Sequence, residues 1–439
     1  MHAHFAGKHD IHDLTEGGRL DLAGTGDFVS RAGFFLFYLR PKYRILIVHH
    51  NLKYMKAKKI IKKDYAKMAL ALHKKLGGKL EVVSKKRLVT RDDWSTMYTP
   101  GVGAVSSHLA THPKDARAYT MKRNTVAVIS DGSAVLGLGN LGPIAALPVM
   151  EGKCAILKEM ADVDGFPIVL DTQDTEEIIK TIINIAPGFG GINLEDISAP
   201  RCFEIEERLK EALNIPLMHD DQHGTAIVVL AGLMNAVKVV KKKFENIKVV
   251  VVGAGAAGRA ITLLLVKAGI TNVIVTDSTG VIYKGRKGMA QYKNDLAKVT
   301  NPENCKGIVA DAVKGADVII GVSGPGTITK AHIEAMAKDA IVFALANPIS
   351  EIKPDDARSA GARIVATGRS DYANQVNNSL VFPGIFRGAL DRNVTKITDD
   401  MKLAAAKKIA GLVKKPTADE IVPKVTTPGL VKAVASVIR

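Results

Sequence analysis

The sequence predicts an α/β protein of two domains, and two observations lead to this prediction. Short apolar runs alternate with helix-like stretches along most of the 439 residues, which is typical of parallel sheets covered by helices. In the second half, an apolar run leads into the glycine-rich stretch 253–258 and then into a helix-like stretch. This strand–turn–helix order indicates a Rossmann-type parallel sheet in the C-terminal half.

The first 54 residues differ from the rest and are predicted to be an extension of uncertain order. A metal-binding histidine tract is the less favoured interpretation of this segment. From Met55 onward, apolar residues recur at three- and four-residue spacing, which predicts a helix that ends at Gly77-Gly78. The extension holds six of the 12 histidines, namely His2, His4, His9, His12, His49 and His50.

The first domain is predicted to span residues 55–221, and the second to span residues 222–439. A long apolar helix over 225–240 lies near the boundary. The first domain is expected to have strands at 125–129, 167–170, 191–194 and 215–218, with helices at 174–185 and 201–213. The second is expected to have strands at 248–252, 273–276, 318–321, 341–345 and 364–366, and helices from Asp399 onward.

The composition is that of an ordinary globular protein, with 47% hydrophobic and 24% charged residues. Lysine and arginine (61) outnumber aspartate and glutamate (44), which gives a formal net charge of +17. The basic residues are scattered at helix-like positions, which favours solvated helix faces over a nucleic-acid surface. We therefore expect no nucleic-acid partner, although a positive field also suits a small anionic ligand.

The cysteines and the lack of a membrane segment together predict a cytoplasmic protein. Cys154, Cys202 and Cys305 are odd in number and form no CxxC pair, which favours a reducing compartment. No apolar stretch reaches the ~18 residues that a membrane-spanning helix requires. The N-terminus also lacks the pattern of a signal peptide, so no membrane partner is expected.

A dinucleotide-binding turn is predicted at Gly253-Ala254-Gly255-Ala256-Ala257-Gly258, directly after the strand 248–252. The first glycine permits a tight turn, the second lets the backbone approach a pyrophosphate, and the third lets helix and strand pack closely. The free N–H groups of the following helix face the anion. The glycine pattern at 137–142 is the weaker candidate, because Pro148 would break the helix that such a site needs.

Asp277 ends the next predicted strand, at a spacing at which an acidic residue binds the ribose hydroxyls of NAD. A carboxylate there would repel the additional phosphate of NADP. Lys284, Arg286 and Lys287 are close in sequence, however, and could receive that phosphate. NAD is therefore favoured as the cofactor, with NADP left open.

Two acidic pairs follow two predicted strands of the first domain. Glu195-Asp196 follows the strand 191–194, and Asp220-Asp221 follows the strand 215–218. With a helix between them, these strands should be parallel, so both pairs would lie at the same edge of the sheet. Oxygen ligands without a cysteine or histidine suit Mg²⁺ or Mn²⁺. The alternative is structural, since acidic pairs are common in loops and Asp221 could cap the helix that begins at Thr225.

Five separated motifs resemble those of the malic enzymes, specifically of the shorter prokaryotic type. The resemblance runs from about Tyr65 to Leu390. The motifs are Tyr98-Thr-Pro-Gly-Val102, the stretch Gly137–Gly142 with Pro148–Lys153, Asn193-Leu-Glu-Asp196, His219-Asp-Asp-Gln-His-Gly-Thr-Ala226, and Asn374-Gln-Val-Asn-Asn378 leading to Phe382-Pro-Gly-Ile-Phe386. The resemblance implies an N-terminal malate-binding domain and the oxidative decarboxylation of malate to pyruvate with reduction of NAD or NADP.

The resemblance also implies a role for individual residues, with Tyr98 as general acid and Lys153 as general base. Asp220 lies beside the metal ligands and is expected to orient Lys153 or a metal-bound water. A homodimer is expected from the family. Metal binding by Mg²⁺ or Mn²⁺ is implied for Glu195, Asp196 and Asp221, pyrophosphate binding for Ala254, Gly255, Ala256 and Ala257, and positions near the nicotinamide and the substrate carboxylate for Asn347 and Asn378.

Two features limit what the resemblance implies. The larger animal-type enzymes carry a substrate-binding arginine just before the glycine pattern, whereas Asp131-Gly132-Ser133-Ala134 contains none. A lysine also acts as a base only if its pKa is low, and burial near a divalent ion is expected to lower the pKa of Lys153. The alternatives are a malolactic enzyme with tightly held NAD, or a catalytically silent NAD-binding regulator.

Overall fold

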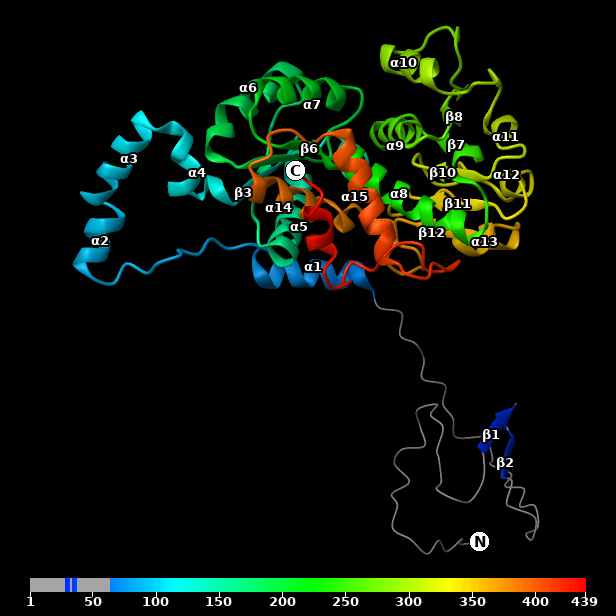
Figure 1. Ribbon diagram of the computed structural model, residues 1–439, viewed down its shortest axis with the longest axis horizontal. Helices are drawn as coiled ribbons and strands as arrows, with labels where there is room; N and C mark the ends of the chain where they lie inside the picture. Colours follow the sequence, from blue (N-terminus) through cyan, green and yellow to red (C-terminus); the bar gives the residue numbers. More distant parts are fainter. Residues whose placement is uncertain (1–27, 32–33, 38–63) are drawn as a thin grey trace, which may run out of the picture. The chain divides into compact units, whose positions relative to one another are not determined.

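A computed structural model of the chain describes residues 28–31, 34–37 and 64–439 (Figure 1). The chain divides into a unit of residues 1–71 and a unit of residues 72–439. In the first unit, strands β1 (Phe28–Arg31) and β2 (Phe34–Phe37) form an antiparallel pair. The histidine tract lies outside the described residues. Helix α1 (Tyr65–Leu76) ends directly before Gly77, as predicted, and the start predicted for it at Met55 also lies outside them.

An exposed segment precedes the first large sheet. It contains α2 (Arg91–Met97) and α3 (Gly101–Thr111), followed by η3 (Pro113–Asp115), α4 (Ala116–Tyr119) and η4 (Met121–Arg123). Thr90 caps α2 through a reciprocal pair of hydrogen bonds with Asp93, which satisfies backbone N–H groups at the helix start. Neither α2 nor α3 has a buried residue. These helices therefore keep apolar surface free for contact with something outside the unit.

The first large sheet has four parallel strands in the order β4 (Asp164–Val169), β3 (Thr125–Ser130), β5 (Gly191–Leu194) and β6 (Leu217–His219). Apolar residues of α6 (Thr175–Ile185) and α7 (Arg201–Ala212) pack against one face of this sheet. Residues of α5 (Pro143–Ala161) pack against the other face. Figure 1 shows α6 and α7 side by side. The predicted β–α alternation of this half is confirmed.

The second large sheet has six strands in the order β12 (Ile364–Thr367), β11 (Ile341–Ala344), β10 (Val318–Gly321), β7 (Lys248–Val252), β8 (Asn272–Asp277) and β9 (Gly280–Val281). All neighbours are parallel except β8 and β9. The helices after these strands are α9 (Ala256–Lys267), α10 (Gln291–Val299), α11 (Val309–Ala312), α12 (Lys330–Glu334) and α13 (Pro354–Ser359). The central strands are fully buried apolar runs, as parallel strands covered on both faces require.

Helix α8 (Asp220–Val239) joins the two sheets and lies in a core that both share. Fourteen of its residues are buried, and the apolar cluster around it includes residues of β3 and of β7. Three C-terminal helices, α14 (Phe382–Arg392), α15 (Asp399–Leu412) and α16 (Leu430–Ala435), complete this core. Short turns η5 (Ala186–Gly188), η6 (Phe244–Asn246) and η7 (Asn378–Leu380) connect the larger elements.

Two local predictions were wrong. The helix predicted from Thr225 begins at Asp220, because His219 has the extended backbone of a helix-capping residue and the acidic pair forms the first turn. Pro148 does not break α5, which runs continuously from Pro143 to Ala161. Pro148 removes only its own N–H from the helix, and its carbonyl accepts a hydrogen bond from Lys79 Nζ at 2.7 Å.

Candidate active site

A buried lysine lies between two carboxylates where α5, β5 and α8 meet. Lys153 Nζ donates to Asp220 Oδ2 at 2.5 Å and lies 2.8 Å from Glu195 Oε1. The Lys153 side chain is only 11% exposed, and its ammonium group lies 4.7 Å from the centre of the Phe382 ring. Asp220, which was predicted to lie near Lys153, is thus its closest carboxylate partner.

The low pKa expected for Lys153 beside a divalent ion stays a prediction, because in the chain by itself the surrounding carboxylates act in the opposite direction. Burial alone would lower the pKa, but the carboxylates of Asp220, Glu195 and Asp221 outweigh burial and raise it above its ordinary value. The sequence placed Lys153 in an apolar helix and did not show how many carboxylates surround it. The amine is therefore protonated as long as these carboxylates carry their full charge.

Glu195, Asp196 and Asp221 form a compact cluster, as predicted. One carboxylate oxygen of each residue lies within 4.8 Å of one oxygen of each of the other two. The reason is that β5 and β6 are parallel neighbours, so the turn after β5 and the first turn of α8 meet at one sheet edge. The backbone N–H of Asp196 donates to Asp221 Oδ2 at 2.8 Å and holds the two segments together.

The electrostatics of this cluster fit a divalent cation. Burial, followed by repulsion from Asp221, raises the pKa of Asp196 to about 7 and that of Glu195 well above its usual range. Asp196 Oδ2 is buried and has no hydrogen-bond partner among the described residues. Repelling oxygens and an unpaired buried acceptor are both relieved by a hard cation such as Mg²⁺ or Mn²⁺.

Two glycines allow Asn347 and Asn378 to approach this cluster. A Cβ on Gly224 of α8 would lie 1.9 Å from Asp220 Oδ1 and 2.9 Å from Asn378 Cβ. A Cβ on Gly137 would lie 1.8 Å from the Asn347 carbonyl oxygen. The next residue toward the cluster, Leu136, donates its N–H to Asp196 Oδ1 at 3.1 Å. The segments that carry both asparagines therefore pack on segments that carry the carboxylates.

The predicted dinucleotide turn has the backbone that such a site needs. Gly253 has a positive φ of 119°, and a Cβ there would lie 2.5 Å from the Val322 carbonyl oxygen. A Cβ on Gly258 would lie 1.8 Å from the Gly253 carbonyl oxygen, so only glycine permits this helix–strand approach. Open space lies where a Cβ of Gly255 would be, directly at the N-terminus of α9. These features fit a bound pyrophosphate.

Asp277, at the end of β8, is already paired with protein groups. Arg286 contacts Asp277 Oδ2, and Lys293 Nζ lies 2.7 Å from the same oxygen. Thr279 donates to the other oxygen through its hydroxyl and its backbone N–H. Although burial alone would raise the pKa of Asp277, these donors hold it well below its usual range. Sequence analysis anticipated Arg286 near this carboxylate but not Lys293.

Tyr98 is not part of the buried cluster. It lies between α2 and α3, and 65% of it is exposed. Its phenol makes no hydrogen bond with a described residue, whereas its backbone N–H donates to the Trp94 carbonyl at 2.9 Å. The segment is anchored further along the chain, where Arg117 Nη2 donates to the Leu390 carbonyl at 2.7 Å. The predicted general acid is thus exposed and away from Lys153 within the chain.

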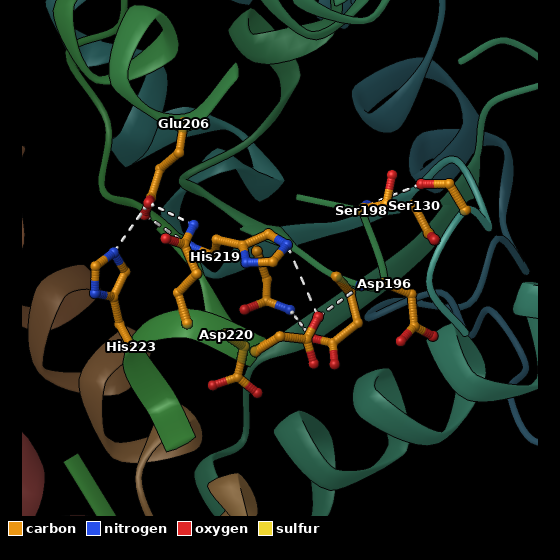
Figure 2. A network of polar contacts seen from close by, with 12 residues as sticks. Ser130, Asp196, Ser198, Glu206, His219, Asp220 and His223 are labelled. Atoms are coloured by element: carbon orange, nitrogen blue, oxygen red, sulfur yellow. Dashed lines mark hydrogen bonds and ion pairs between the residues drawn. The ribbon is translucent and has the colours of Figure 1, made fainter. Parts of the chain in front are cut away.

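A buried carboxylate behind the cluster was missed by sequence analysis (Figure 2). Glu206 of α7 accepts hydrogen bonds from the His219 backbone N–H at 3.0 Å and from Gln222 Nε2 at 3.1 Å. Its carboxylate also lies 2.9 Å from His223 Nε2. Burial alone would raise the pKa of Glu206, but His223 holds it well below its ordinary value. Glu206 therefore anchors the turn that carries Asp220 and Asp221.

The interaction of Glu206 with the turn of Asp220 and Asp221 could be predicted only in part from the sequence. His219 and His223 flank the acidic pair in one of the five motifs, and in the structure His219 ends β6 while His223 lies in the first turn of α8. Glu206 lies among other glutamates of a helix, with nothing in the sequence to distinguish it.

Comparisons with known proteins decide the family. A family model described as "Malic enzyme, NAD binding domain" matches residues 222–435. A model described as "Malic enzyme, N-terminal domain" matches residues 77–180 and 172–210. The chain belongs to the malic enzyme family. The predicted family, the two-part α/β fold and the prediction of an oxidoreductase that uses NAD or NADP are therefore confirmed.

Similar malic enzymes cover most of the chain. The NAD-dependent malic enzyme of Geobacillus stearothermophilus is 56% identical over 83% of this chain and 76% of its own length. The bifunctional malic/malolactic enzyme of Bacillus subtilis is 53% identical over 84% of this chain and 91% of its own length. The crystal structure of the NAD-dependent malic enzyme of Thermotoga maritima matches with a TM-score of 0.82 and 46% identity, over 84% of this chain and 98% of that one.

Proposed function

We propose that the Lys153 cluster is where this malic enzyme oxidises and decarboxylates malate. The observation that supports this most strongly is a buried amine held between Asp220 and Glu195, beside three carboxylates that gather from separate segments. Glu195, Asp196 and Asp221 would hold a divalent ion, which would supply Lewis acidity to bound malate. Bound NAD supplies the hydride acceptor.

Lys153 takes the proton of the C2 hydroxyl as hydride leaves C2, with Asp220 orienting the amine. The amine must first lose its own proton. Neutralisation of Glu195 and Asp221 would weaken the attraction that holds this proton, which leaves burial as the cause that lowers the pKa of Lys153 and Asp220 as the main group that raises it. Asn347 and Asn378 are proposed to hold the substrate carboxylates or the nicotinamide, and this is supported by the packing of Asn347 on the Gly137 loop and of Asn378 on Gly224 of α8. Loss of CO2 follows, and Tyr98 donates the proton to C3.

The enzyme is further proposed to work as a homodimer in which Tyr98 serves the site of the other copy. Tyr98, Trp94 and Met97 are exposed apolar side chains on a segment without buried residues. Leu136, Leu138, Leu141 and Ile144 are exposed on the loop that borders the carboxylates and at the start of the following helix. Two exposed apolar surfaces, one beside an incomplete site and one carrying its missing residue, favour self-association.

Three further assignments complete the proposal. NAD is the preferred cofactor because Asp277 suits the ribose hydroxyls, but pairing with Arg286 and Lys293 reduces its repulsion of NADP.

The proposed domains are 55–221 and 222–439 after the extension 1–54, and the family match starting at residue 222 supports this boundary. A cytoplasmic location is proposed because Cys154, Cys202 and Cys305 are unpaired. No described helix is long and apolar enough to cross a membrane.

A malolactic activity is the second candidate, because the related enzyme of Bacillus subtilis is named for both activities. An assay with malate and Mn²⁺ separates the two by following the near-ultraviolet absorbance of reduced nicotinamide with NAD and NADP in parallel. Reduced cofactor and pyruvate in equal amounts are the expected products. Lactate without reduced cofactor would contradict the proposal.

A further inference from the structure

A cavity lies behind the carboxylate cluster, on the other side of Glu206, where α7 and α8 meet α9 and α15. Its volume is about 270 Å³, and its polar lining comes from Glu206, Glu207, Lys210, His223, Arg259, Asp399 and Lys402. Residues of both proposed domains contribute, since α7 belongs to the first and α9 and α15 to the second. Ligand sites occur preferentially at such junctions between domains. The mechanism uses none of the cavity's three permanent cations.

Three cations from three different helices converge on this cavity. Lys210 extends from α7, Arg259 from α9 and Lys402 from α15. The Lys402 side chain is only 6% exposed, which is unusual for a lysine. Burial, followed by repulsion from Lys210, lowers the pKa of Lys402. Cations this close to one another in a partly enclosed space attract an anion.

Three carboxylates line the cavity beside these cations, but two of them are exposed and their charge is screened by solvent. Glu207 is exposed and makes no ion pair with a described residue. Glu206 is shared among His223, Gln222, the His219 N–H and Lys210 Nζ at 2.7 Å. Asp399 pairs with Lys402 at 2.9 Å, but its side chain is 60% exposed and screened by solvent.

Arg259 is the cation of the three that no described carboxylate contacts, although its charge also acts on Asp295. It has no carboxylate within 4.0 Å among the described residues, and its guanidinium lies 4.6 Å from the centre of the Phe203 ring. Its five N–H donors are therefore available to an incoming oxyanion.

We propose that this cavity binds a compact dianion, either inorganic phosphate or a short dicarboxylate, between Lys210, Arg259 and Lys402. The size of the cavity suits such an ion and is too small for a dinucleotide. An ion held there bridges the two domains through α7, α9 and α15. Glu206, which lines the cavity, also anchors the turn of Asp220 and Asp221, so occupancy is coupled to the metal cluster.

Calorimetric titration of the whole protein with inorganic phosphate, and separately with succinate, tests this proposal. Saturating NAD fills the dinucleotide site, and EDTA removes divalent ions, so that the four clustered carboxylates repel added anions. We expect one saturable ion per chain. Binding of phosphate alone, of succinate alone or of both identifies which form of dianion the cavity takes, and each of these results supports the proposal.

Three variants locate the ion. Arg259→Gln and Lys402→Met are each expected to weaken binding by about tenfold or more. Lys407→Met removes the same charge from an exposed position of α15 and should bind like wild type. NAD titration checks that each variant is folded, and the partly exposed Arg259 serves as the test if Lys402→Met does not fold. No binding of either anion to wild type, loss of binding when NAD is present, or equal binding to all variants would overturn the proposal.

Discussion

Lys153 is the residue on which the proposed chemistry depends most. Lys153→Met removes the proton acceptor and leaves Asp220 and Glu195 without their counter-charge, so malate oxidation should fall by at least about 10²–10⁴-fold. NAD binding should be nearly unchanged, because the glycine-rich turn is separate. Lys158→Met, on the exposed face of the same helix, is the matched control. Steady-state oxidation and NAD titration check both, and near-normal turnover would remove Lys153 from the mechanism.

The pKa of Asp196 predicts how metal stabilisation depends on pH. Because this pKa is raised to about 7 in the folded protein, the folded state holds a proton that the unfolded chain releases near pH 4. Stability without metal therefore falls as pH rises from about 4 to about 7. A divalent ion requires the ionised carboxylate, so Mg²⁺ should raise the melting temperature more at about pH 8 than at about pH 6.

Thermal unfolding of two variants checks this pH dependence. Asp196→Asn should lose most of the Mg²⁺ effect at both pH values. Asp162→Asn, at a side chain that is 85% exposed, should keep the effect. An Mg²⁺ effect that is equal at both pH values in wild type would be inconsistent with a raised pKa at Asp196.

At the residue scale, sequence reasoning grouped the acidic residues correctly because parallel strand ends define their place. Glu195, Asp196 and Asp221 do gather at one edge. It did not anticipate that carboxylates raise the pKa of Lys153 in the chain by itself, because this pKa depends on how many charges converge in space. It also missed Glu206, because a buried glutamate in an amphipathic helix looks like any other until its three-dimensional neighbours are known.

At the scale of elements, the first turn of α8 must allow close approach of Asp220 and Asn378. Gly224→Ala would place a Cβ 1.9 Å from Asp220 Oδ1, so Asp220 must move away from Lys153. A shift of about 1 Å at a catalytic group can cost about 10²-fold in rate, and a loss of this order in kcat is expected.

Gly232→Ala on the same helix is the matched control for this variant. Its Cβ would lie 3.2 Å from Val422 Cγ1 and 3.3 Å from Phe343 Cε1, so the neighbours must shift by only a few tenths of an ångström and Asp220 is not contacted. Alanine also has the higher helix propensity, by ~1 kcal/mol. Activity close to wild type is therefore expected for Gly232→Ala. Equal losses in kcat for the two variants would show that the effect comes from the helix and not from Asp220.

Elements could be predicted best where their apolar runs are unbroken. The strands at 191–194, 248–252 and 318–321 have the bounds that the sequence predicts. Helix starts were harder to predict. The first turn of α8 contains charged residues, which lack the regular spacing of apolar residues by which a helix is recognised. The helix break predicted at Pro148 was wrong. A proline costs one helix hydrogen bond, and the burial of Met150, Cys154 and Leu157 on the same helix outweighs that cost.

At the scale of the whole molecule, mixing two inactive variants tests whether Tyr98 acts in the other copy. Lys153→Met and Tyr98→Phe proteins should each be inactive in pyruvate formation. In a mixed dimer, a site built from both copies carries either both substitutions or neither, so activity should return after the two proteins are unfolded and refolded together. Continued inactivity of confirmed mixed dimers would place Tyr98 and Lys153 in the same copy.

Trp94→Asp should favour the monomer in gel filtration, because it puts a charge on the exposed apolar surface.

The proposed chemistry requires that one divalent ion binds where Glu195, Asp196 and Asp221 meet beside Lys153. Mn²⁺ titration followed by electron paramagnetic resonance measures this binding directly in the NAD-bound protein. We predict one tightly bound Mn²⁺ per chain in wild type and in the exposed control Asp162→Asn, and severe weakening in Asp221→Asn. An Asp221→Asn protein that binds Mn²⁺ as wild type does would contradict the account.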